Sequence, residues 1–169
     1  LERYAEEVGL NMQQFRADMQ ADETGARIEE DQALARRLQA GGTPHFFING
    51  YRLRGAQPYP NFQRVIDARM EEAQALVANG TPRSRVYQTL QQDAERGPAP
   101  MIQPEPSAGG GAAAAEPEVA EIPIGDEPFI GAEDADVVMA VYSDFTCGFC
   151  NRFRGTLYDA LEGYEDRVK

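Results

Sequence analysis

The apolar positions of the chain follow a helical period at its start, and this pattern predicts three amphipathic helices. Apolar side chains recur every three or four residues over 1–8, 12–19 and 22–40. Gly9 separates the first two helices, and Asn11 is a suitable N-cap for the second. The third has an apolar stripe that runs up to a terminating glycine pair: Ile28, Leu34, Ala35, Leu38, Gly41 and Gly42.

The pattern then changes to short runs of β-forming residues, typical of a hairpin over residues 43–55. Asn49-Gly50 stands between the two runs, and this dipeptide favours the tight turn of a β-hairpin. Pro44 lies at the entrance of the first run, a position that proline tolerates. Helical spacing returns over 58–79, and Thr81-Pro82 predicts the start of one more short helix.

Residues 98–136 have a different composition, rich in proline, glycine and alanine. Ten acidic residues and no Lys or Arg fall between Arg96 and Arg152. Because such a stretch buries little apolar surface and repels itself, we expect a solvated, extended linker. The 169-residue chain carries a net charge of −12, which argues against nucleic acid and anionic membrane surfaces as partners. No apolar run approaches the length of a membrane span.

The last predicted unit joins a strand to a helix through the two cysteines of the chain. Residues 137–142 are almost all apolar and β-forming, as in a strand covered on both faces. Cys147 is expected at the N-terminus of the following helix, where unpaired N–H groups and the helix dipole favour negative charge. These effects lower a thiol pKa and make the sulfur a nucleophile. Cys150, one turn inside the helix, is then the resolving thiol.

Two structural interpretations compete with a redox role for this C-x-x-C pair. A zinc site needs four ligands, and the chain offers two cysteines and His45 as nitrogen or sulfur ligands, so no metal is expected. A structural disulfide across so short a loop restrains the unfolded chain little. The preferred hypothesis is a redox-active Cys147–Cys150 pair that works without any other cofactor.

Two motifs resemble one family, the DsbA-like thioredoxin-fold disulfide oxidoreductases. Its active-site stretch is similar to Tyr142-Ser143-Asp144-Phe145-Thr146-Cys147-Gly148-Phe149-Cys150. Its cis-proline loop and following hairpin are similar to Gly42-Thr43-Pro44-His45-Phe46-Phe47-Ile48-Asn49-Gly50. The helices of residues 1–40 resemble the later part of that family's helical insertion. The resemblance implies an α/β, thioredoxin-like fold of the DsbA type.

The order of the segments departs from the family, in which the C-x-x-C strand comes first. We expect 1–79 to be the C-terminal half of one DsbA-like domain, 80–97 a short extra helix, 98–136 a linker and 137–169 the N-terminal half of the next domain. The fold is then split and permuted. Either a parent with tandem domains or a permuted or swapped unit explains this order, and the halves can complete each other within one chain or in a domain-swapped homodimer.

The opening residues Leu1–Tyr4 fall inside a helical pattern, which indicates a piece of a longer chain rather than a signal peptide. By the resemblance, the parent is exported to a bacterial periplasm or cell envelope, where disulfides persist.

The resemblance also implies roles at the dithiol. Cys147 would form a mixed disulfide with a substrate protein, and Cys150 would resolve it. Thr43 and Pro44 would bind the extended substrate strand. Phe149 is expected on the surface beside the dithiol, as an apolar contact for substrates.

Two further residues are candidate modulators. Asp144 is a candidate proton relay, and a capping or loop hydrogen bond is its alternative role. His45 would influence the thiolate if it were charged, and a strand residue facing away is its alternative.

Three functions are consistent with these features. The first is a thiol:disulfide oxidoreductase that acts on proteins with thiols or disulfides and is served by a redox partner protein. The second is an inactive fragment or substrate-binding module, and the third a metallochaperone. The intact C-x-x-C favours the first. Gly148-Phe149 differs from the proline-containing dipeptides common in the family, so oxidase, isomerase and reductase directions stay open.

Overall fold

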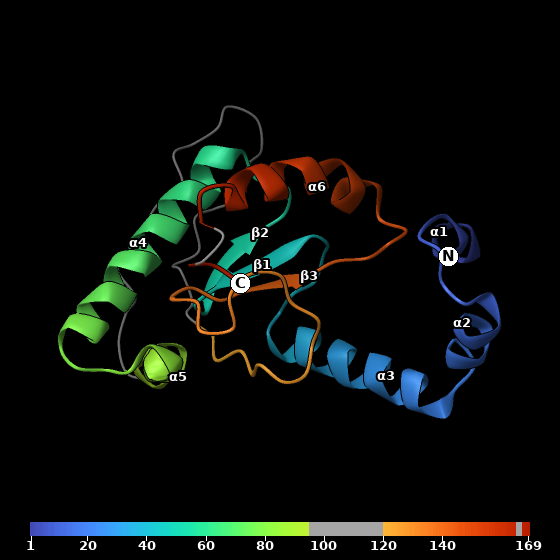
Figure 1. The fold of residues 1–169 in the computed structure, drawn as a ribbon, viewed down its shortest axis with the longest axis horizontal. Coiled ribbons are helices and arrows are strands. Elements are labelled where there is room, and N and C mark those ends of the chain that lie inside the picture. The colour runs from blue at the N-terminus through green and yellow to red at the C-terminus, as the bar shows by residue number, and fades with distance from the viewer. Residues whose placement is uncertain (95–119, 165–166) are drawn as a thin grey trace.

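The computed structural model describes residues 1–94, 120–164 and 167–169 (Figure 1). Its helices are α1 (Glu2–Glu7), α2 (Met12–Asp18), α3 (Asp22–Arg37), α4 (Tyr59–Ala78), α5 (Arg83–Ala94) and α6 (Gly148–Leu161). Its strands are β1 (His45–Ile48), β2 (Tyr51–Arg54) and β3 (Met139–Tyr142). The sheet has the order β2-β1-β3, and both outer strands run antiparallel to β1. No helix of this described part is long and apolar enough to cross a membrane.

The predicted hairpin forms β1 and β2, and its turn also holds the C-terminal segment. Asn49 and Gly50 have φ values of 46° and 82°, the left-handed conformation that a type I′ turn requires at both positions. The Asn49 N–H donates to the Val138 carbonyl at 2.8 Å, and its side-chain oxygen accepts from the Val138 N–H at 2.8 Å. Asn49 therefore closes the hairpin and fixes the entrance of β3.

The strand before the dithiol pairs with the strand after Pro44, although the two are distant in sequence. Phe46 lies opposite Val141, and Ile48 lies opposite Met139. On the other side of β3 the end of the chain forms a parallel bridge between Val137 and Val168. The sheet thus joins the first segment of the chain, residues 1–94, to its last segment, residues 120–164 and 167–169.

A hydrophobic core on one face of the sheet is shared by both segments. The ring of Phe46 meets Phe62 of α4 edge-on, with centroids 4.8 Å apart, and lies 5.2 Å from Phe153 of α6. All three side chains are buried. Figure 1 shows α4 and α6 over this region of the sheet. The members of the core are Phe46, Ile48, Tyr51, Leu53, Phe62, Val65, Ile66, Met70, Val137, Met139, Phe153, Ala160 and Val168.

A second, smaller core lies on the opposite face and corrects the linker prediction. Of the predicted linker, 98–119 fall outside the described residues. Residues 123–131 are exposed, as expected of a linker, but Ile122 is buried against Leu38 and Phe47. Asp136 is also buried, and it pairs with Arg167 at 3.1 Å and Arg83 at 3.5 Å. Ile122 and the paired carboxylate of Asp136 thus anchor the two ends of this segment on the fold.

The helices follow the predicted pattern except for the apolar stripe of α3. The Asn11 side chain caps α2, as expected, by accepting from the N–H groups of Gln13 and Gln14. Ile28 of α3 is 51% exposed, and the buried residue of the predicted stripe is Leu38, the C-cap residue that follows α3. The turn after α3 is made by Gln39, with φ at 53°, ahead of the predicted glycine pair.

Candidate active site

Cys147 is the N-cap residue of α6, at the end of the helix where backbone N–H groups lack helical partners. Its backbone is extended, with φ −74° and ψ 114°, and its Sγ accepts a hydrogen bond from the Cys150 N–H at 3.5 Å. Both cysteines are free thiols and partly buried. The strand–CGFC–helix unit thus places the first sulfur where the helix favours a negative charge.

The loop of Thr43 and Pro44 lies directly against this sulfur. The Thr43–Pro44 peptide bond is cis. The Cys147 thiol donates to the Thr43 backbone oxygen at 3.6 Å, although the two residues are 104 positions apart. A carbonyl oxygen only accepts, so this hydrogen bond forms when the thiol is protonated. The pairing of β1 with β3 brings the two predicted motifs together.

The surroundings of Cys147 lower the pKa of its thiol to about 7. Hydrogen bonding with the Thr43 side chain is the largest cause, and the backbone N–H of Cys150 is the next. Both groups stabilise the thiolate, which is the reactive form. The lowered pKa increases the fraction of Cys147 side chains that are thiolates at neutral pH.

Two exposed aromatic side chains flank the nucleophile. Phe149, between the cysteines, is 62% exposed, and the Arg152 guanidinium carbon lies 4.6 Å from its ring centroid. Phe145 is 84% exposed, and sequence reasoning did not select it. The sequence signal that could have identified Phe145 as a site residue is its position two residues before the first cysteine. Both rings offer apolar contact area for a partner close to the sulfur.

Asp144 hydrogen-bonds to the turn that leads into α6. Its Oδ1 accepts from the Thr146 N–H at 2.6 Å and from the Thr146 hydroxyl at 2.7 Å, and these bonds lower the pKa of its carboxyl. Its backbone oxygen accepts from the Cys147 N–H at 3.1 Å. This geometry is that of the alternative role, a loop hydrogen bond, and the proton relay stays a prediction.

His45 is buried on the face of the sheet that carries Phe47, and its ring stacks on Phe47 with centroids 5.1 Å apart. Burial, followed by the nearby charges of Arg52 and Arg54, lowers the pKa of His45 to about 4. The imidazole is therefore neutral at pH 7. Burial thus favours the uncharged form, and an influence of a charged His45 on the thiolate stays a prediction.

The buried, neutral His45 predicts a pH-dependent stability. Its folded pKa of about 4 lies below the ordinary value of 6.5, so the unfolded chain takes up the proton first. The contribution of the neutral His45 to the free energy of unfolding is complete above pH 6.5 and declines as the pH falls toward 4. Urea unfolding at pH 7.5, 5.5 and 4.5 should show that the free energy of unfolding falls less with decreasing pH for His45→Leu than for the unsubstituted chain. Equal losses in both chains would contradict this assignment.

Comparisons with known proteins agree with this geometry. Residues 1–67 match the family model of the DSBA-like thioredoxin domain, and residues 124–169 match a thioredoxin family model. The first match contains the Thr43–Pro44 loop, and the second contains the C-x-x-C pair. Each matched region is therefore similar to thioredoxin-like proteins, the first of them to DsbA-like ones, and the predicted α/β thioredoxin-like fold is confirmed.

A curated relative with a similar segment is the Na(+)/H(+) antiporter NhaA of Herminiimonas arsenicoxydans. It is 38% identical over 65 residues, which make up 38% of this chain and 10% of that protein. The chain thus matches about a tenth of the length of this relative. No solved structure gives a significant match.

Proposed function

We propose that the chain is a thiol:disulfide oxidoreductase with an active site built jointly by its first and last segments. The observation that carries the proposal is the position of the Cys147 sulfur. It caps α6 and lies 3.6 Å from the Thr43 oxygen of the cis-proline loop. The thioredoxin-type family matches of both segments support the same chemistry.

The reaction is a two-step exchange of disulfide bonds. The Cys147 thiolate attacks a substrate disulfide, so the substrate S–S bond breaks, a mixed disulfide forms and one substrate thiolate leaves. The Cys150 thiolate then attacks the Cys147 sulfur, which releases the second substrate thiolate and forms the Cys147–Cys150 disulfide. The substrate gains two electrons and the enzyme loses two. The reverse sequence oxidises a substrate dithiol.

Thr43 and Pro44 are proposed to bind the substrate beside the sulfur, and Phe149 to contact its apolar side chains. The adjacency of the loop to Cys147 and the exposure of Phe149 support these roles. The substrates are proteins with thiols or disulfides, and a redox partner protein restores the dithiol or the disulfide. We also propose an export location, the periplasm or cell envelope, and a parent with tandem domains.

Incubation of the chain with peptides tests the activity. The reduced chain is mixed with a peptide that contains one intramolecular disulfide, and the oxidised chain with the same peptide in its dithiol form. Mass spectrometry should show the loss of two hydrogens from the reduced chain as the peptide gains them, or the reverse. The equilibrium ratio against glutathione then gives the redox direction. A chain that exchanges no faster than free cysteine would refute the proposal.

A further inference from the structure

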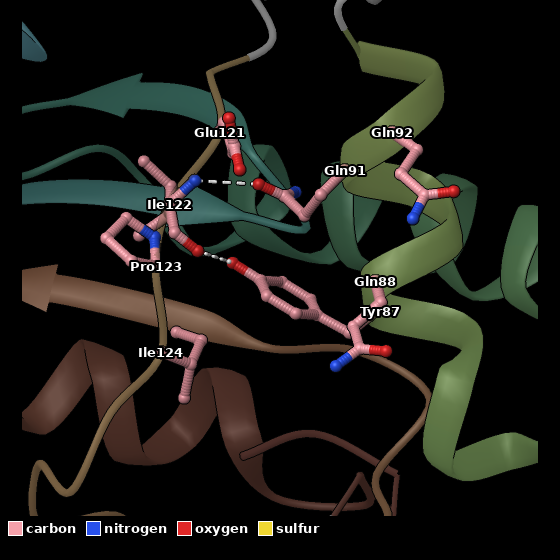
Figure 2. Close-up of a pocket in the computed structure, with 8 residues that line it drawn as sticks. All are labelled: Tyr87, Gln88, Gln91, Gln92, Glu121, Ile122, Pro123 and Ile124. Carbon is pink, nitrogen blue, oxygen red and sulfur yellow. Dashed lines mark hydrogen bonds between the residues drawn. The ribbon is translucent and has the colours of Figure 1, made fainter.

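Residues 120–127, here named the latch segment, lie extended on the face of the sheet opposite the larger core. The Ala120 N–H donates to the Gly50 carbonyl at 2.9 Å. The Ile122 N–H donates to the Gln91 side-chain oxygen at 2.7 Å, and the Tyr87 hydroxyl donates to the Ile122 carbonyl at 2.7 Å (Figure 2). Two side chains of α5 thus recognise both backbone groups of a single extended residue.

The side chain of that residue is the apolar anchor of the latch segment. Ile122 is 3% exposed and packs with Leu38 and Phe47. These two side chains come from the end of α3 and from β1, so three elements of the first segment form its binding surface. Burial of one Ile side chain gives a binding contribution of about 10- to 100-fold.

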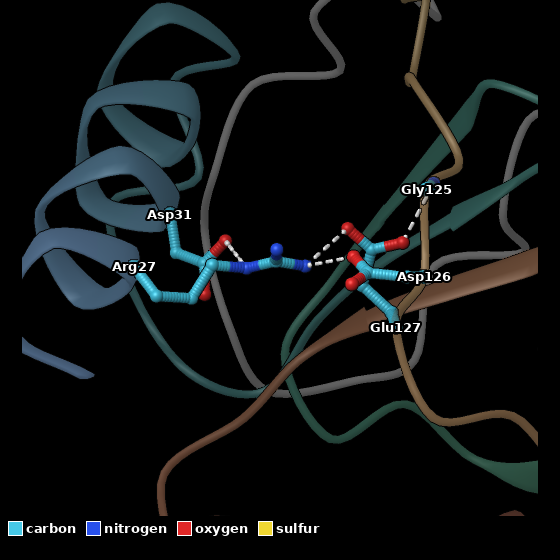
Figure 3. A network of polar contacts seen from close by, with 5 residues as sticks. All are labelled: Arg27, Asp31, Gly125, Asp126 and Glu127. Carbon is cyan, nitrogen blue, oxygen red and sulfur yellow. Dashed lines mark hydrogen bonds and ion pairs between the residues drawn. The ribbon is translucent and has the colours of Figure 1, made fainter. Parts of the chain in front are cut away.

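The acidic end of the latch segment meets a single arginine of α3. Arg27 Nη2 contacts Asp126 Oδ1 at 3.0 Å and Glu127 Oε1 at 3.1 Å (Figure 3). Its Nε lies 3.9 Å from Asp31 on its own helix. The Gly125 N–H donates to the other Glu127 oxygen at 2.7 Å, which orients that carboxylate. An exposed ion pair of this kind adds little affinity but selects acidic partners.

The rest of the contact is open. A cavity of about 330 Å³ is lined by α5, including Gln88 and Gln92, and by residues 121–124. Ile124 is 44% exposed, and the buried side-chain nitrogen of Gln91 has no hydrogen-bond partner in the described part of the chain. The latch segment is therefore held at a few separate points rather than built into the sheet.

We propose that Arg27, Leu38, Phe47, Tyr87 and Gln91 form a docking site for extended peptides that carry an aliphatic residue followed by acidic residues, and that the latch segment is its releasable occupant within the same chain. Backbone recognition at one residue, an apolar hole and a cation four residues further along are the elements of linear-motif binding. The site lies on a different face from the core that holds α6, and it uses no cysteine chemistry.

A binding experiment with a vacated site tests the proposal. Ile122→Asp in the full chain should displace the latch segment, because a charged side chain cannot occupy the apolar hole. A fluorescein-labelled peptide with the sequence of residues 120–127 is then titrated and followed by anisotropy. We expect saturable binding at least about 10-fold tighter than to the unsubstituted chain, in which the latch segment competes.

Matched peptides and hosts define which contacts matter. Aspartate in place of the peptide isoleucine should weaken binding at least about 10-fold. Amides in place of its two final acids should weaken it about 2- to 5-fold and remove its salt dependence. Tyr87→Phe in the host should weaken it about 3- to 10-fold, and Ser84→Ala, at an exposed position of the same helix outside the cavity, should leave it unchanged. Equal binding of the aspartate peptide, or no saturable binding, would overturn the proposal.

Amide hydrogen exchange tests whether the latch segment is released from its site, and it does not require that the Ile122→Asp chain folds. In the otherwise intact protein, Tyr87→Phe should speed exchange of the Ile122 amide about 3- to 10-fold and leave the β1–β3 amides unchanged. Exchange of Ile122 only together with the β1–β3 amides would show that the segment does not open separately, and would refute a releasable latch. Neither measurement depends on the dithiol, so a failure here is distinct from a failure of the proposed activity.

Discussion

Replacement of Cys147 by serine should lower the rate at which the reduced chain attacks 5,5′-dithiobis(2-nitrobenzoate) at least about 10-fold, because the remaining thiol, Cys150, lies one turn inside α6. The thiol of Cys147 has a pKa of about 7, because Thr43 and the Cys150 N–H stabilise its thiolate. A serine hydroxyl stays protonated at this pH and is no nucleophile toward a disulfide. The release of the coloured thiolate at pH 7 measures the rate directly.

Cys150→Ser is the matched control, because it removes a thiol three residues away and leaves the proposed nucleophile intact. This variant should react at nearly the rate of the unsubstituted chain but stop at the mixed disulfide, which mass spectrometry detects as a stable adduct on Cys147. If instead Cys147→Ser reacts rapidly with the reagent and Cys150→Ser does not, Cys150 is the nucleophile and the proposed assignment is wrong.

Phe153→Ala should destabilise the folded chain by about 3–5 kcal/mol, the usual range for a buried phenylalanine. Phe153 is 5% exposed, and its ring lies 5.2 Å from Phe46 and 5.0 Å from Phe62. The other two rings belong to the first segment of the chain. The substitution therefore leaves a cavity at the contact that holds α6, and with it Cys147, on the sheet. Urea unfolding followed by circular dichroism measures the change.

Phe145→Ala provides the comparison for this loss. Phe145 precedes the same dithiol but is 84% exposed, so its removal should change stability by less than about 0.5 kcal/mol. If both variants lose the same free energy, the last segment does not share a core with the first. If Phe145→Ala alone slows exchange with a peptide, the exposed ring contributes to substrate contact.

The parts of the fold that the sequence predicted are those with local chemical signals. Asn49-Gly50 predicts the turn because both residues tolerate a positive φ. The apolar run of 137–142 and the spacing after Cys147 predict the strand and helix around the dithiol, although the observed strand begins at Met139. The two motifs were identified as partners through the family resemblance, and the pairing of β1 with β3 is the contact that joins them.

The parts that escaped prediction depend on contacts between distant residues. Ile122 lies in a stretch whose proline, glycine and acidic content is that of a linker, and nothing local shows that Leu38 and Phe47 leave a hole for it. The left-handed Asn49 signals a turn but not its bonds to Val138. Ile28 falls on the apolar stripe predicted for α3, yet spacing alone does not show that its side chain is 51% exposed.

The most direct test of a jointly built site is the thiolate absorbance of the reduced chain near 240 nm as a function of pH. If Thr43 of the first segment lies against Cys147 of the last, a thiolate should titrate with a midpoint of about 7, and Thr43→Val should raise that midpoint. A midpoint near the free-thiol value of about 8.5, unchanged by Thr43→Val, would contradict the assembly of the two segments around Cys147.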